Sequence, residues 1–485
     1  MTEASITVIR DAAWVVAWDT ARQGHVYLRN CDVAFAGAEI LQVGGAFDGE
    51  ASREIDGRGL MVMPGLVNIH SHPTSEPMNK GVTDEVESPN FHHSSLYEFL
   101  PVLGNDKDGV PPCHKAAMAE LLQSGCTTVV DYSVPFEGWL DQLAETGIRA
   151  CIAPTFRDAP WSTPDGHRLE YDWSDAERGP NGFDTAKRLV ALAAQHPSGR
   201  LMGMISPGQI DTVSEGLLQA AHRHAEERNL PFQIHAAQSV AEFHEIARRH
   251  GKTPIQWMQD IGILTERSIV GHCIFLDHHP WLHWTSRKDM DLMAESGATV
   301  AHCPTVFMRR GIALNTFGAY KRHGVNLGVG TDTYPHNILD EMRNVLTIAR
   351  AVAGTVTDTS TADVFNAATI GGAKALRRDD IGRLAPGAKA DIVLVDLAHP
   401  AMRPLREPVR TLIYCAQDRA VRDVFVDGVQ VVQDGACTTV DLAAELQALE
   451  AAQQRALARV PKLDWAGRSA DELAPMAFAT APGLD

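Results

Sequence analysis

The sequence has no long apolar run and no excess of basic residues. No stretch approaches the ~20 consecutive apolar residues that a membrane-spanning helix needs. Lysine and arginine total 43 against 61 aspartates and glutamates, which gives a net charge of −18. A surface with this charge repels phosphate groups, so we expect no nucleic acid and no membrane as partners.

The eight cysteines include no C-x-x-C pair, and the first residues lack the basic-then-apolar pattern of a secretory signal. A chain of 485 residues needs no disulfide staples, so we expect reduced thiols and a cytoplasmic protein. Hydrophobic residues make up 45% and charged residues 21%, which excludes a disordered or fibrous chain. These features leave a soluble globular protein.

The pattern of residue types divides the chain into four segments. Residues 1–64 hold short β-type runs separated by Gly and Asp turns, and residues 381–438 repeat this style. Residues 65–380 alternate short apolar strands with amphipathic helices. Residues 439–485 begin with an Ala-, Leu- and Gln-rich helix, expected to end near residue 458, and continue as a polar tail.

The middle segment contains eight candidate strands with helical sequence between them. Strands that alternate with helices form a parallel sheet, and eight such units predict an α/β fold, a closed (β/α)8 barrel of the TIM type. The expected strands are 66–70, 127–131, 148–153, 201–206, 231–235, 268–272, 298–302 and 325–332.

Local signals place two helices and two insertions. A glycine follows the expected helix 116–124, and Ser239 with Glu242 predicts a capping box for a helix after the fifth strand. Residues 73–112 and 157–183 are long and poorly periodic. Loops of this length inside a compact domain are usually functional or disordered.

Metal-competent side chains stand at the ends of five expected strands. Because parallel strands of a barrel end on one face, these side chains are expected to converge there. His72 follows two positions after the first of them, and on an extended strand such residues face the same side. The five strand-end residues are His70, His235, His272, His302 and Asp332.

The residue types predict a site for one divalent metal ion. Neutral imidazole suits zinc, iron or cobalt, and a carboxylate adds charge, a proton acceptor and affinity for manganese. We expect His70, His72, His235 and Asp332 as ligands of an ion that is most often zinc in such sites. Asp332 would also be the general base, while His272 would ligate the ion or hold the attacking water.

These motifs resemble the amidohydrolase superfamily: PGLVNIHSH at the first strand, QIHAAQ at the fifth, VGH at the sixth and GVGTD at the eighth. The chain is similar to the subgroup of triazine hydrolases and cytosine- or adenosine-type deaminases. HSHPTSEPMNKG with SSLYEF also resembles the phenylurea and molinate (thiocarbamate) hydrolases. The resemblance implies a composite β-sandwich built from both chain ends and a homo-oligomer, a dimer or larger. LMGMISPGQI lacks the strand-four lysine of binuclear members, which implies one ion.

One departure from the subgroup bears on the substrate. Its deaminases carry H-x-x-E after strand five, where this chain reads His235-Ala-Ala-Gln238. Because an amide cannot give up a proton near neutral pH, Gln238 cannot be a general acid. It would instead form hydrogen bonds or be a structural amide at the start of the next helix, and Glu242 or Glu245 could take the acid's role.

The missing acid favours hydrolysis of a non-peptide C–N bond in a small amide, urea or carbamate. There Asp332 would pass the proton of water to the leaving amine, and His302 would face the carbonyl or lie behind the ligands. The alternative is an aminohydrolase, a deaminase or dechlorinase, acting on an N-heterocycle such as a pyrimidine, purine or triazine.

Substrate-binding residues are expected on two segments near the strand ends. The insertion 73–112 carries Phe91, His92 and His93, which would line the pocket, although a solvated loop fits the two histidines equally. Met308 follows the seventh strand and is expected to meet the substrate.

Overall fold

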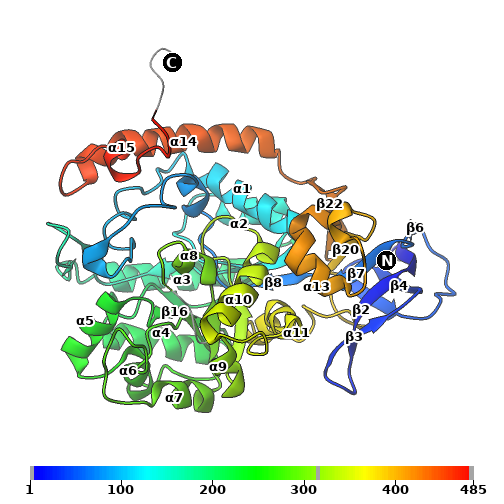
Figure 1. Ribbon diagram of the computed structural model, residues 1–485, viewed down its shortest axis with the longest axis horizontal. Coiled ribbons are helices and arrows are strands. Elements are labelled where there is room, and N and C mark those ends of the chain that lie inside the picture. Colours follow the sequence, from blue (N-terminus) through cyan, green and yellow to red (C-terminus); the bar gives the residue numbers. More distant parts are fainter. Residues whose placement is uncertain (1–4, 313–316, 480–485) are drawn as a thin grey trace.

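A computed structural model describes residues 5–312 and 317–479. Strands within residues 6–64 and 392–437 build β-sheets on one side, and parallel strands with helices form the larger part (Figure 1). The first terminal sheet has the order β5-β4-β1-β6, with β1 (Ile6–Ala12), β4 (Cys31–Ala36), β5 (Glu39–Val43) and β6 (Arg53–Asp56). The second has the order β23-β22-β21-β20-β7-β2-β3, with β2 (Trp14–Asp19), β3 (Gly24–Leu28), β7 (Leu60–Pro64), β20 (Ile392–Asp396), β21 (Val421–Val426), β22 (Val429–Gln433) and β23 (Ala436–Cys437).

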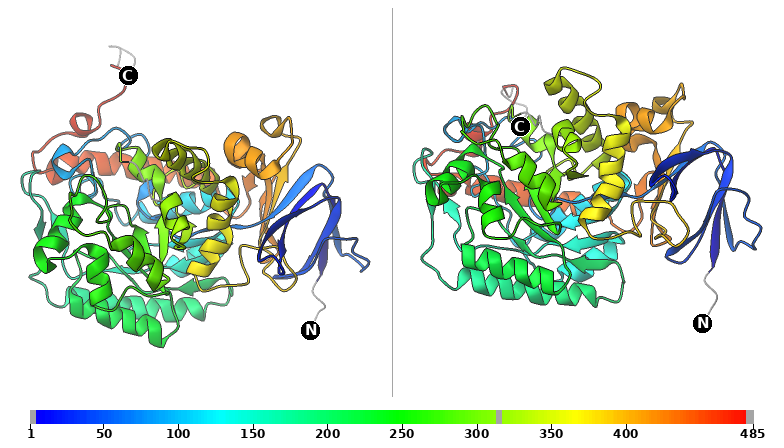
Figure 2. Two further views of the ribbon diagram at one scale, coloured as in Figure 1. Left: turned by 60° about the horizontal axis from the view of Figure 1, so that its bottom comes forward. Right: turned by 90° about the horizontal axis from the view of Figure 1, so that it is seen from below.

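The second terminal sheet joins both chain ends. β7 pairs with β20 in antiparallel register, with Val62 opposite Leu394. Both sheets contribute to one buried apolar cluster, which includes Ile9 from the first sheet and Phe425 from the second. Because the two sheets share this core, the N-terminal and C-terminal strands fold as one unit beside the parallel strands (Figure 2).

All eight predicted strands are present, in two parallel four-stranded sheets. The first sheet has the order β14-β10-β9-β8, with β8 (Leu66–Asn68), β9 (Cys126–Asp131), β10 (Arg149–Ile152) and β14 (Leu201–Gly203). The second has the order β16-β17-β18-β19, with β16 (Phe232–Ala236), β17 (Ser268–His272), β18 (Thr299–His302) and β19 (Asn326–Val329).

Backbone hydrogen bonds link the two parallel sheets along both outer edges. On one side Ile69 N donates to Val329 O at 3.0 Å, at the edge between β8 and β19. On the other side Gln233 N donates to Ile205 O at 3.0 Å, between β16 and the segment after β14. The strand ends of both sheets are therefore brought to a common region.

Helices separate the strands along the chain and lie around them. They are α1 (Val110–Gln123), α2 (Trp139–Thr146), α3 (Arg178–Ala194), α4 (Glu215–Glu227), α5 (Val240–His250), α6 (Pro254–Asp260), α7 (Asp289–Ser296), α8 (Pro304–Met308), α9 (Phe317–Arg322), α10 (Ile338–Ala353), α11 (Thr361–Asn366), α12 (Gly372–Ala375), α13 (Pro408–Thr411), α14 (Leu442–Leu463) and α15 (Ala470–Leu473). In the part of the chain that the structure describes, no helix combines the length and apolarity needed to cross a membrane.

Two helices are longer than the sequence predicts. α1 begins at Val110 rather than near residue 116, because the prolines at its first turn fit positions whose N–H groups need no partner. α14 continues past Pro461 to Leu463 instead of ending near residue 458. Pro461 lies in the last turn of α14, so the helix loses only the hydrogen bond that the missing N–H would have donated, and only two helical residues follow it.

The insertion 73–112 is covered by the C-terminal helix α14 (Figure 1). The Gln453 side chain donates to Met78 O at 2.6 Å, and Arg455 Nε donates to Asp106 at 2.7 Å. Within the insertion only short turns form, including η1 (Glu76–Asn79) and η2 (Pro89–Phe91). The C-terminal helix thus holds the loop that begins next to His72.

Candidate metal centre and active site

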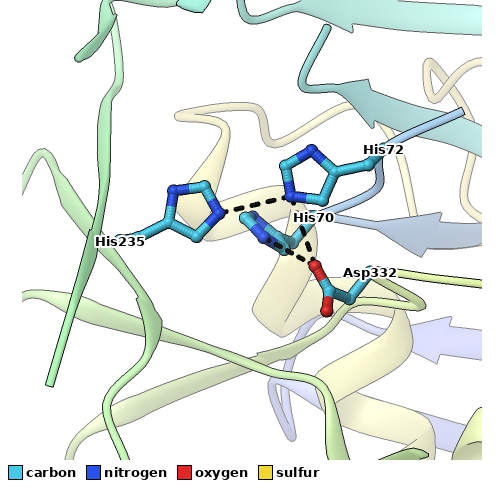
Figure 3. Close-up of side chains that lie close together, drawn as sticks. All are labelled: His70, His72, His235 and Asp332. Atoms are coloured by element: carbon cyan, nitrogen blue, oxygen red, sulfur yellow. Dashed lines mark hydrogen bonds and ion pairs between the residues drawn. The ribbon is translucent and has the colours of Figure 1, made fainter. Parts of the chain in front are cut away.

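Four of the predicted side chains meet at the strand ends (Figure 3). His70 and His72 follow β8, His235 lies in β16, and Asp332 follows β19. His70 Nε2 and His72 Nε2 lie 3.2 Å and 3.3 Å from Asp332 Oδ1, and His72 Nε2 lies 3.2 Å from His235 Nε2. One ligand atom from each residue falls within 4.8 Å of all the others. Residues separated by 262 positions in the sequence therefore form one group.

The outer ring nitrogens of all three histidines are held by acceptors. His72 Nδ1 lies 2.9 Å from Tyr132 O, and His235 Nδ1 lies 2.7 Å from Gly208 O. A carbonyl oxygen only accepts, so both Nδ1 atoms carry the hydrogen. His70 Nδ1 lies 3.3 Å from the Gln233 side-chain oxygen in the same arrangement. Each Nε2 atom therefore directs a lone pair inward, as an oriented metal ligand does.

The donor set fits a single cation. Two lone-pair nitrogens 3.2 Å apart cannot hydrogen-bond to each other, and a carboxylate beside them adds further repulsion unless a positive charge lies between. In a tetrahedral site with ~2.1 Å bonds, neighbouring ligand atoms are separated by about 3.4 Å, close to these distances. The three shortest separations in this group match that spacing. The structure thus brings the predicted ligands His70, His72, His235 and Asp332 together in a group that could hold a metal ion.

Burial and mutual charge set the protonation states that ligands need. Burial alone would raise the pKa of Asp332, but the imidazoles of His272, His70 and His72 hold this pKa well below its usual range. Burial, helped by the neighbouring imidazoles, lowers the pKa of His235 well below its ordinary value. At neutral pH the aspartate is ionised and His235 is neutral, which are the states that bind a divalent ion.

Removal of the metal ion is expected to abolish activity reversibly. Prolonged dialysis against a chelator should leave less than about one hundredth of the initial rate, because catalysis then lacks an activated water. Zinc, cobalt or manganese at one equivalent per chain should restore it. Elemental analysis of the active protein checks the count, and two tightly bound ions per chain would contradict a single site.

His272 lies beside the group of four. Its Nε2 is 4.0 Å from Asp332 Oδ1, and its ring centre is 4.9 Å from that of His70. The residue ends β17 with a φ of +72°, which redirects the side chain at the end of the strand. Phe307 of α8 packs against it with ring centres 5.0 Å apart, and its expected role of ligating the ion or holding the attacking water stays a prediction.

Gln238 lies in the turn between β16 and α5. Its side-chain Nε2 is buried and has no hydrogen-bond partner among the described residues. Glu242 is fully buried and accepts hydrogen bonds from the N–H groups of Ala237 and Gln238 at 2.6 Å and 3.2 Å. The Glu242 carboxylate thus fixes Gln238 through its backbone N–H, and the nearby side-chain amide of Gln238 opposes the strong rise in the Glu242 pKa that burial and Asp211 cause.

Only one of the two hydrogen bonds of the predicted capping box forms. Ser239 accepts the N–H of Glu242 at 3.0 Å, so it caps α5 as expected. The Glu242 carboxylate does not return to Ser239 but binds the two N–H groups of the preceding turn. Ala237 has a φ of +55°, and this tight turn leaves buried donors that the carboxylate satisfies.

His302 is not brought to the group of four. Its neighbour Ala301 shares a buried cluster with Ile269. Because side chains on a strand alternate between faces, His302 points to the opposite side of β18 from Ala301. The His302 ring instead packs on Phe317 of α9, with centres 5.1 Å apart, and both ring nitrogens are buried without a partner among the described residues. Its expected role toward the carbonyl stays a prediction, one that this placement does not support.

The expected substrate-binding residues occupy different environments. Phe91 is buried and packs on Tyr97, with ring centres 5.8 Å apart. His92 is exposed, and His93 Nδ1 lies 3.1 Å from Glu87, so the two histidines take part in the loop's own structure. Met308, the last residue of α8, is half-buried next to the residue that contacts His272.

Several residues near the centre escape sequence reasoning. The backbone carbonyl of Tyr132 and the side-chain oxygen of Gln233 hold the outer nitrogens of His72 and His70. A backbone carbonyl leaves no signal in the residue type, so the sequence could not indicate Tyr132. Gln233 could have been found, because it lies two positions before His235 on the same face of the strand. Glu76 is buried, and burial together with the charge of Asp332 raises its pKa to about 7. Tyr97 donates to or accepts from Ser239 at 2.7 Å, which joins the insertion 73–112 to the turn that carries Gln238.

Parallel α/β sheets with three histidines and an aspartate at the strand ends define a metal-dependent hydrolase. A family comparison agrees: the profile of the amidohydrolase family matches residues 61–431. The chain belongs to the amidohydrolase family, and it is a hydrolase of carbon–nitrogen bonds other than peptide bonds.

Relatives are similar over most of the chain. A 5'-deoxyadenosine deaminase of Methanothermobacter thermautotrophicus is 26% identical over 411 residues, which cover 83% of this chain and 89% of the relative. A 5-methylthioadenosine/S-adenosylhomocysteine deaminase of Nitratidesulfovibrio vulgaris is 28% identical over 460 residues, covering 93% and 98%. These names describe the relatives.

Solved structures share the fold. An adenosine deaminase from Xanthomonas campestris with bound zinc has a TM-score of 0.78 at 24% identity, covering 94% of this chain and 99% of its own. An atrazine chlorohydrolase from Arthrobacter aurescens, complexed with zinc, has a TM-score of 0.77 at 21% identity, covering 92% and 100%. At these identities the likeness concerns the fold.

Proposed function

We propose that this protein is an aminohydrolase that releases ammonia from an amino-substituted N-heterocycle. The observation that carries the proposal is the group of three histidines and Asp332, within a chain whose full-length relatives are named as deaminases. The sequence alone favours an amide, urea or carbamate, and the relatives support its alternative better. The overall change is R–NH2 + H2O → R–OH + NH3.

The residues of this chain supply proton transfer and orientation. His70, His72, His235 and Asp332 would hold a divalent ion, which would supply an acidified water and a Lewis acid. Asp332 accepts a proton as the water oxygen bonds to the ring carbon, and it returns this proton to the amino nitrogen as the C–N bond breaks. His272, 4.0 Å from Asp332, orients the attacking water.

Gln238 supports this reaction as a hydrogen-bond donor rather than as an acid. Gln238 follows His235 by three residues, and its buried Nε2 has no hydrogen-bond partner within 3.5 Å among the described residues, so a ring nitrogen of the substrate would accept its hydrogen. A donor aimed at developing negative charge stabilises the transition state without giving up its proton. The rate falls short of what a true acid would give, because the ring nitrogen gains no full proton.

The test is a product assay on the zinc-loaded protein. We expect ammonia from at least one amino-purine, amino-pyrimidine or amino-triazine in a panel, at a rate that the Asp332→Asn variant loses. Matched phenylureas, carbamates and simple amides form the second arm, with the released amine as readout. Turnover in the second arm alone would overturn the aminohydrolase proposal.

Replacement of Gln238 tests its role directly. Gln238→Glu is expected to raise ammonia release at least tenfold, because general acid catalysis contributes about 10²–10⁴-fold. Burial and the adjacent Glu242 keep the new carboxyl protonated near neutral pH. Gln238→Leu, which has similar size and no donor, is the matched control and should lower the rate. A Gln238→Glu rate below wild type would contradict this role.

A second candidate is hydrolysis of a small amide, urea or carbamate, and Gln238 is the observation that favours it. Such a substrate needs no protonation of a ring nitrogen, so an amide in place of a carboxylic acid at position 238 does not lower the rate. The leaving amine takes its proton from Asp332 in this case too. The similarity of HSHPTSEPMNKG to phenylurea and molinate hydrolases stays a prediction that the same two-arm assay tests.

We also propose how the chain is organised around this function. The hydrogen-bonded edges between the parallel sheets support a closed (β/α)8 barrel over 65–380, with a β-sandwich from 1–64 and 381–438 and a helical tail over 439–485. Residues 1–4 and 480–485 lie outside the described residues. Homo-oligomer formation and a cytoplasmic location stay predictions, which light scattering and fractionation test.

A further inference from the structure

The turn after β9 contains a buried polar network that the proposed reaction does not use. Asp131, the last residue of β9, accepts His114 Nε2–H at 2.9 Å and Trp139 Nε1–H at 2.6 Å, and it also accepts the Ser133 hydroxyl. The side chains of His114 and Asp131 are both fully buried. Each bond that is lost leaves a buried polar group unpaired, so the network holds this turn rigidly.

The network has a defined direction. Gln142 Nε2 lies 2.7 Å from His114 Nδ1, and an amide nitrogen only donates. His114 Nδ1 is therefore the acceptor, and the ring hydrogen lies on Nε2, where it is donated to Asp131. Donors run in one sequence from Gln142 through His114 to Asp131. This arrangement leaves one hydrogen-bonding pattern available to the turn.

Tyr132, the next residue, is the partner of one metal ligand's outer nitrogen and contacts the partner of a second. Its backbone oxygen accepts His72 Nδ1–H at 2.9 Å. Its hydroxyl hydrogen-bonds to Pro207 O and lies 3.0 Å from Gly208 O, and the Gly208 carbonyl accepts His235 Nδ1–H at 2.7 Å. The Tyr132 ring also lies against the imidazoles, 5.5 Å from His70 and 4.8 Å from His235 between centres.

The same turn is joined to the segment on both sides of His72. Tyr132 N donates to Ser71 O at 2.9 Å, before the ligand. Thr74 donates its hydroxyl to Ser133 at 3.3 Å, after the ligand. A shift of the turn would therefore move His72 and its acceptor together.

We propose that Asp131 and Tyr132 are positioning residues that set the affinity of the metal centre. Asp131 fixes the turn through its three donors. Tyr132 transmits that position to His72 through its carbonyl, and to His235 through the contact of its hydroxyl with the Pro207-Gly208 segment. Partners of the outer nitrogens typically contribute 10–100-fold to metal affinity. The inference depends on the ligand group and not on the identity of the substrate.

The test uses Co²⁺ as the probe and needs no substrate. Its dissociation constant is measured on the metal-depleted full chain by competition with a chromophoric chelator, and its visible absorption reports the ligand geometry. We expect Tyr132→Phe to weaken Co²⁺ binding about tenfold and Asp131→Asn to weaken it 10–100-fold, with shifted absorption bands in both.

Asp289→Asn is the matched control. Asp289 is also fully buried and accepts from Thr253, Gln256 and the N–H of Asp277 at 2.7–2.9 Å, none of which belongs to the metal group. This variant should lose stability to denaturant yet keep the wild-type Co²⁺ constant and spectrum. If Tyr132→Phe keeps the wild-type Co²⁺ constant and spectrum, the proposal is overturned, even where Asp131→Asn does not fold. The proposal is also overturned if Asp289→Asn weakens Co²⁺ binding as much as the two test variants do.

Discussion

Asp332→Asn is expected to lower kcat by about 10³-fold or more while the protein remains folded. The carboxylate lies within 3.3 Å of two ligand histidines and is held ionised by the surrounding imidazoles, which lower its pKa. An uncharged amide cannot take the proton of the attacking water, and general base catalysis of this kind contributes about 10²–10⁴-fold. The measurement is kcat at saturating metal, so that weaker binding of the ion does not mask the chemical effect.

A buried aspartate in the terminal sheet provides the control. Asp423 and Asp332 are equally buried, each with 5% of its surface exposed, but Asp423 lies in β21 and pairs with Arg422. Asp423→Asn should therefore change stability without a comparable loss of kcat. A kcat for Asp332→Asn within tenfold of wild type would show that another group is the base.

Arg149→Met is expected to reduce the free energy of unfolding by about 3–5 kcal/mol. Arg149 begins β10 with 1% of its side chain exposed, and it binds Asp391 through two bonds of 3.0 Å and Asp427 through a third contact. Methionine fills much of the volume but leaves Asp391 buried without its counter-charge. The first transition in urea, followed by circular dichroism, measures the loss.

Arg58→Met is the matched control for charge removal. Arg58 pairs with Asp56 at 2.8 Å, but both side chains are largely exposed. An exposed pair typically contributes 0–1 kcal/mol, so this variant should stay within about 1 kcal/mol of wild type. If Arg149→Met lowered the free energy of unfolding no more than Arg58→Met does, the buried ion pair would not hold β10 to the terminal sheet.

Much of the site could be predicted because its ligands occupy strand ends. The apolar run before His70 and the alternation of His70 with His72 are local features, as is the GVGTD segment that ends in Asp332. Parallel strands end at one face whatever the details of packing. The four ligands therefore follow from local pattern together with one rule of topology.

The differences between expectation and structure involve side-chain directions and hydrogen-bond partners that local pattern does not contain. His302 ends its strand as His70 does, yet its ring packs on Phe317 of α9. Glu242 has the spacing of a capping box, but its carboxylate binds the turn of Gln238. Glu242 takes this position because buried N–H groups left unpaired would cost more than the capping bond is worth, whereas the ring of His302 fills space beside Phe317.

The sequence by itself determined the strand order, the metal-ligand types and the family of the protein. Only the tertiary structure decided which carbonyls orient the ligands, as with Tyr132 and Gly208, and which distant segment covers the insertion 73–112. The physical reason is the range of the forces involved. Residue type and spacing encode alternation and strand ends within a few residues, whereas hydrogen bonds between remote backbone groups depend on where the whole chain has packed.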